Sequence, residues 1–61
     1  MNYKITSPLI IADPIALAEL VFPSKNWTRL ESSQDYILLT FDSEQIPVSV
    51  SNLIKIEKVT S

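Results

Sequence analysis

The chain has 61 residues, of which five are basic and seven are acidic, so its formal net charge is −2. It contains no glycine, no cysteine and no histidine. These absences exclude glycine-rich phosphate loops, zinc sites of the usual kind, thiol nucleophiles and imidazole bases. We therefore expect a protein that is not an enzyme and that uses no cofactor or metal.

A chain of this length forms a single domain, here residues 1–61, and small domains bury a smaller share of their surface than large ones. Disulfides, metals or oligomerisation commonly add the missing stability. Without cysteine no disulfide forms, and without cysteine and histidine a structural metal site is poorly supported. We therefore expect a homo-oligomer or a larger protein partner, with an unusually well packed monomer as the alternative.

The apolar stretch near the N-terminus is interrupted by Pro8 and Asp13, and no run of about 20 apolar residues follows it. We therefore expect neither a signal peptide nor a membrane span. A cytoplasmic location, without membrane contact, is the resulting prediction.

Apolar residues alternate from Tyr3 to Ile11, which predicts a strand. Pro8 has no amide proton, so this strand is expected at a sheet edge or as two short pieces. Asp13 and Pro14 are typical of a helix start, because Asp caps the first turn and Pro suits the first helical position. The apolar run that follows predicts a short helix at about 14–22, which Pro23 ends.

Glu19 alone gives this helix a polar stripe, so the helix needs cover on several sides. One small core covers one side well. We expect the remainder to be a protein interface formed by Leu17, Leu20, Val21 and Phe22. The alternative is a sheet that curls round the helix and hides it completely.

Two strands are predicted after the helix. The first extends from Trp27 to Ser32. The second, Tyr36 to Phe41, is the strongest strand of the chain, because it is aromatic and aliphatic on both faces. Such a strand belongs in the centre of a sheet.

Alternation over Ile46–Val50 predicts a half-buried strand, which Pro47 places at an edge or a bulge. A tight turn at Ser51–Leu53 then leads to a last strand that ends near Val59. This order resembles the closing half of SH3-like small barrels. The predicted fold is α+β: a small curled antiparallel sheet of four or five strands, SH3-like in its second half, with one short apolar helix.

These features indicate a protein-binding module, such as a small accessory subunit, adaptor or inhibitor of a larger complex. A phage- or plasmid-encoded modulator of a host machine fits this size. The alternative is a small nucleic-acid-binding regulator that stacks bases on Trp27 and Tyr36 beside Lys25 and Arg29. The net negative charge disfavours nucleic acid as a partner, and a large aromatic such as Trp27 also serves as core.

Overall fold

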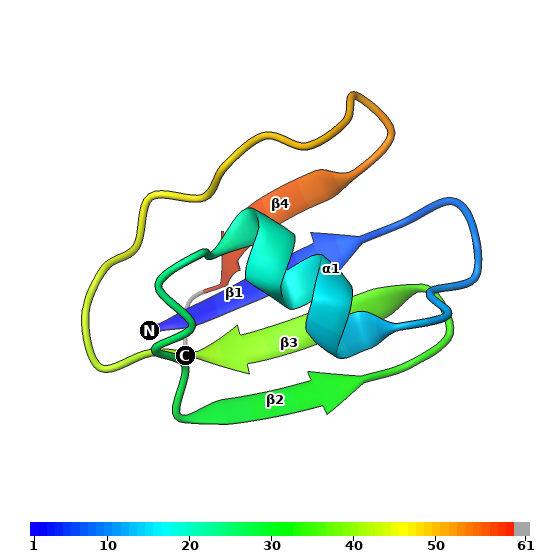
Figure 1. Cartoon of the computed structure of the whole chain (residues 1–61). Helices are drawn as coiled ribbons and strands as arrows, with labels where there is room; N and C mark the ends of the chain where they lie inside the picture. The colour runs from blue at the N-terminus through cyan, green and yellow to red at the C-terminus, as the bar shows by residue number, and fades with distance from the viewer. Residues whose placement is uncertain (60–61) are drawn as a thin grey trace.

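The computed structural model describes residues 1–59. Its elements are β1 (Asn2–Thr6), α1 (Pro14–Val21), β2 (Arg29–Ser32), β3 (Tyr36–Thr40) and β4 (Lys55–Val59). The strands form one antiparallel sheet in the order β2-β3-β1-β4, and α1 lies across one face of it (Figure 1). The chain therefore has the small α+β fold that the sequence predicts.

The period of two along each strand divides the sheet into two faces. Tyr3 and Ile5 in β1 stand opposite Leu39 and Ile37 in β3, and all four side chains are buried. The residues between them, such as Lys4, point to the other side, because successive side chains of a strand alternate. We call the side under α1 the helix face and the other side the open face.

The predicted helix signals operate as expected. The Asp13 carboxylate accepts a hydrogen bond from the Ala16 amide at 3.1 Å, and Pro14 occupies the first turn. At the other end the Phe22 amide donates to the Ala18 carbonyl at 2.8 Å, so Phe22 is the C-terminal cap. The predicted helix at about 14–22 is thereby confirmed.

An aromatic cluster closes the core at this helix end. The Phe22 ring lies 5.3 Å from the Tyr3 ring and 4.8 Å from the Phe41 ring, measured between centroids. Tyr3 and Phe41 make an edge contact at 5.5 Å, and Trp27 meets Phe41 edge-on at 6.5 Å. These contacts join the helix to β1 and to the residue after β3.

The expected position of the first strand is wrong. β1 lies between β3 and β4, not at an edge. Its ladder ends at Thr6, so Pro8 falls outside the strand and removes no ladder hydrogen bond. The chain turns there, with the Leu9 amide donating to Ser7 Oγ at 3.1 Å, and Leu9 is exposed instead of sharing the inner face.

The strand predicted over Ile46–Val50 is also wrong, since these residues join no sheet. The Val48 amide donates instead to the Val21 carbonyl at the end of α1, at 2.8 Å. The segment therefore packs on the helix end. By contrast, β3 has a neighbour on each side, which confirms the predicted central strand.

Leu39 tests this arrangement because it belongs to β3 and its side chain is 0% exposed. We expect Leu39→Ala to lower the free energy of unfolding by about 2–5 kcal/mol, through lost burial and the cavity left behind. Urea denaturation measures the change. Leu38→Ala, on the open face and half-buried, is the matched control and should cost less. A loss below about 1 kcal/mol for Leu39→Ala would contradict the core assignment.

Candidate interaction surface

The structure separates the four residues that were expected to form one apolar interface. Val21 and Phe22 belong to the buried core, Leu17 is half-buried against it, and Leu20 is 60% exposed. Residues on one side of a helix face the sheet, and Leu20 lies on the other side. The expectation of a single exposed arc is therefore wrong for Val21 and Phe22, and Leu20 is the member most accessible to a partner.

Most of the exposed apolar side chains come from outside the helix. The segment 42–54 leads from the end of β3 to β4, as the yellow-to-orange trace in Figure 1 shows, and its Ile46 is 91% exposed. Apart from Met1, the exposed large apolar residues are Leu9, Ile10, Ile15, Leu20, Ile46, Val48, Val50 and Leu53. We call these eight residues the apolar set.

The stretches that carry the apolar set are nearly free of charge. Residues 5–12 and 45–54 contain no charged residue, and α1 contains only Glu19. The Glu19 carboxylate lies 3.9 Å from Lys25 Nζ. Exposed apolar side chains without charges among them are typical of protein interfaces, where the central residues are depleted of charge.

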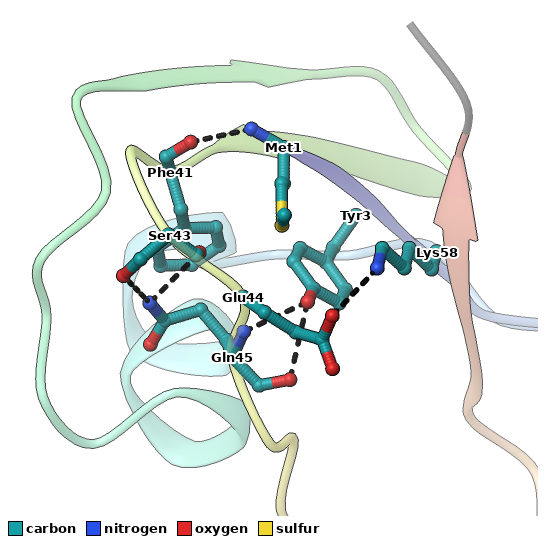
Figure 2. A network of polar contacts seen from close by, with 7 residues as sticks. All are labelled: Met1, Tyr3, Phe41, Ser43, Glu44, Gln45 and Lys58. Atoms are coloured by element: carbon teal, nitrogen blue, oxygen red, sulfur yellow. Dashed lines mark hydrogen bonds and ion pairs between the residues drawn. The ribbon is translucent and has the colours of Figure 1, made fainter.

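The backbone that presents Ile46 and Val48 is held at defined points. The Tyr3 hydroxyl accepts a hydrogen bond from the Gln45 amide at 2.8 Å and donates to the Gln45 carbonyl at 3.1 Å (Figure 2). The Val48 amide is bound by the Val21 carbonyl. The exposed side chains of this segment therefore project from an anchored backbone.

An ion pair adds a further anchor beside Tyr3. Lys58 Nζ and Glu44 Oε1 are 2.9 Å apart, and Figure 2 shows the pair next to the Tyr3–Gln45 contact. The hydrogen bond from Lys58 lowers the pKa of the Glu44 carboxyl below its usual value of 4.5. The same hydrogen bond raises the pKa of the Lys58 ammonium above 10.5.

The open face of the sheet has the opposite character. By the strand register it carries Lys4, Arg29, Glu31, Lys55 and Glu57. Arg29 and Glu31 form an ion pair at 2.6 Å. Lys4 Nζ lies 5.0 Å from the centre of the Tyr36 ring, within range of a cation–π contact. This face has the mixed charge of a solvated surface.

The four residues of the nucleic-acid alternative do not form one strip. Trp27 is half-buried against the core, whereas Arg29 and Tyr36 lie on the open face. Arg29 stands opposite Thr40, four residues along β3 from Tyr36, which corresponds to about 13 Å. Lys25 is near Glu19. Tyr36 lies beside Lys4, which is not one of the four, and Arg29 is paired with Glu31.

Among residues 1–59, no three acidic side chains gather closely enough to hold a metal ion. In the same part of the chain, no helix has the length and apolar character needed to cross a membrane. Comparisons with protein-family models, curated proteins and solved structures find no match to the chain. Its function must therefore be inferred from its own surface.

Sequence reasoning missed most of the apolar set, because it assigned the alternating stretches around Pro8 and Pro47 to strands. A proline removes a ladder donor, so an apolar stretch interrupted by one is a weaker strand. These two prolines, together with the lack of charge around them, are the signal that could have indicated exposed connections instead.

Tyr3→Phe tests the anchoring of segment 42–54. Because it removes both hydrogen bonds to Gln45 but keeps the ring, we expect a loss of about 1–2 kcal/mol in the free energy of unfolding. The Gln45 and Val48 amides should also exchange hydrogen faster. Tyr36→Phe, on the open face, is the matched control and should leave both amides unchanged. Equal exchange in all three proteins would show that Tyr3 does not hold the segment.

The Glu44–Lys58 pair should give stability a defined pH dependence. Because the pKa of Glu44 is lower in the folded state than its usual value of 4.5, its carboxylate stabilises the fold above pH 4.5. This contribution is lost as the pH falls through the lowered pKa. Because the pKa of Lys58 is higher in the folded state than its usual value of 10.5, its ammonium stabilises the fold below pH 10.5. This contribution is lost as the pH rises through the raised pKa.

We therefore expect Glu44→Gln to be slightly less stable than the natural protein at neutral pH. The difference should shrink both in acid and above pH 10.5, and it should fall with added salt. Unfolding midpoints measured across pH check this. When Lys58 is already replaced by Met, Glu44→Gln should change neither the stability at neutral pH nor its dependence on pH and salt. If Glu44→Gln had the same pH-dependent effect with and without Lys58, the pairing would be contradicted.

Proposed function

We propose that this chain is a non-enzymatic protein-binding module. It works in the cytoplasm as a small accessory subunit, adaptor or inhibitor that docks on a larger protein complex. The observation that carries the proposal is the apolar set, which combines high exposure with a nearly charge-free surrounding sequence. The resemblance of the second half to SH3-like barrels stays a prediction, and the proposal does not depend on it.

Energetics favour members of the apolar set as the residues that contact a partner. Fully burying an exposed Leu or Ile side chain contributes about 1.5–3 kcal/mol. Ile46 and Leu20 leave most of that contribution unused within the chain, since they are 91% and 60% exposed. Segment 42–54 is already anchored through Tyr3, so a partner would not have to order it, and this lowers the entropic cost of binding.

Two substitutions test the surface. Leu20→Asp and Ile46→Asp each place a charge on the apolar set at an exposed position, so the fold should persist. We expect each to abolish retention of a protein partner that the natural chain captures from cells of its own source. Ser33→Asp, in the turn before β3, adds the same charge elsewhere and is the matched control.

The captured protein is then purified and titrated directly. A loss of affinity of about tenfold or more for Leu20→Asp and Ile46→Asp, with Ser33→Asp unchanged, is the expected result. Equal binding by all variants would reject the apolar set as the site. Sub-micromolar binding of oligonucleotides, lost in Trp27→Ala or Arg29→Ala, would instead favour the nucleic-acid alternative.

A further inference from the structure

β4 is an edge strand whose outer side pairs with no strand among residues 1–59. It lies beside β1 and ends the sheet order β2-β3-β1-β4. Its second residue, Ile56, stands opposite Ile5 and packs against the core on the helix face. An edge of this kind offers backbone donors and acceptors to another strand.

The charges of β4 alternate in sign around Ile56. Lys55 and Glu57 lie on the open face, opposite Thr6 and Lys4 of β1. Within the strand, Lys55 Nζ and a Glu57 carboxylate oxygen are 3.9 Å apart, and both side chains remain about half or more exposed. Both groups are therefore accessible to a partner strand.

We propose that a second copy of this chain pairs with β4 in antiparallel fashion, with Ile56 on the two-fold axis. In this register Lys55 stands opposite Glu57 of the partner subunit, and Glu57 stands opposite Lys55 of the partner subunit. The two Ile56 side chains meet on the helix face. Cross-strand pairs of opposite charge stabilise an antiparallel pair, and the two sheets join into one.

Charged edge strands often prevent pairing, because like charges meet or a lone charge is directed inward. In β4 like charges do not meet, since two-fold pairing about Ile56 brings opposite charges together. The charge that β4 directs inward is not a lone one, because Lys58 is already bound to Glu44. Self-association, which the sequence led us to expect through the helix, is thus assigned to β4, which contains no member of the apolar set.

The other edge strand provides a built-in control. β2 has the same pattern, with Leu30 between Arg29 and Glu31. It is shorter, and its two charges are held together at 2.6 Å, so fewer interactions are left for a partner. Equivalent changes in β2 should therefore leave assembly unaffected.

Charge reversal tests the register by sedimentation velocity over a wide concentration range. The paired strands are short, so we expect a weak dimer with a dissociation constant of tens to hundreds of micromolar, on the order of small transient interfaces. Lys55→Glu and Glu57→Lys should each weaken it about tenfold or more, because like charges then meet twice. The double variant should restore it to within about threefold.

Arg29→Glu is the matched control, since it makes the same charge change at the β2 edge and should leave the dimer intact. A monomer at all concentrations up to about one millimolar would overturn the proposal. Loss of the dimer in Arg29→Glu, or a double variant as weak as the single ones, would also overturn it. None of these changes touches the apolar set, so the capture of another protein can fail or succeed independently.

A cross-link gives a second measurement. The chain has no cysteine, so a disulfide formed by a single introduced cysteine must join two chains. We expect Ile56→Cys to form a covalent dimer under mild oxidation at least about tenfold faster than Leu30→Cys, the corresponding position in β2. Equal rates in the two variants would contradict the proposed pairing.

Discussion

The contact of Tyr3, Phe22 and Phe41 is the interaction on which the other features depend. Each ring comes from a different part of the chain: β1, the end of α1 and the residue after β3. The rings fix the helix end over the sheet, and the Tyr3 hydroxyl also holds Gln45. One side chain therefore links the core to segment 42–54, because a tyrosine combines an apolar ring with a polar end.

This contact explains why the two sides of the protein differ. With Phe22 buried, Val21 is also directed inward, and the Val21 carbonyl receives the Val48 amide. The residues around Val48 then lie beside the helix end instead of in the sheet, and their apolar side chains remain exposed. The open face, which nothing covers in the described chain, keeps the charged residues that water solvates well.

The two proposed interactions use different physical forces and different residues. The apolar set would bind by removing hydrocarbon from water, which depends little on salt or register. The β4 edge would bind through backbone hydrogen bonds and paired charges, which require one alignment and weaken with salt. A small chain with both could dimerise and still present the apolar set of each copy to a larger partner.

Local sequence patterns are sufficient to predict the helix and the central strand. Asp13 and Pro14 start the helix through short-range hydrogen bonding and a fixed backbone angle, and the apolar run Tyr36–Phe41 identifies the central strand by its composition. Which apolar residues are buried depends on contacts between distant parts of the chain. The alternation of Ile46–Val50 is compatible both with a strand and with an extended connection. The connection is formed here because the Val48 amide bonds to the distant Val21 carbonyl. Likewise, the placement of β1 between β3 and β4 depends on pairing across the whole chain, which a local pattern does not encode.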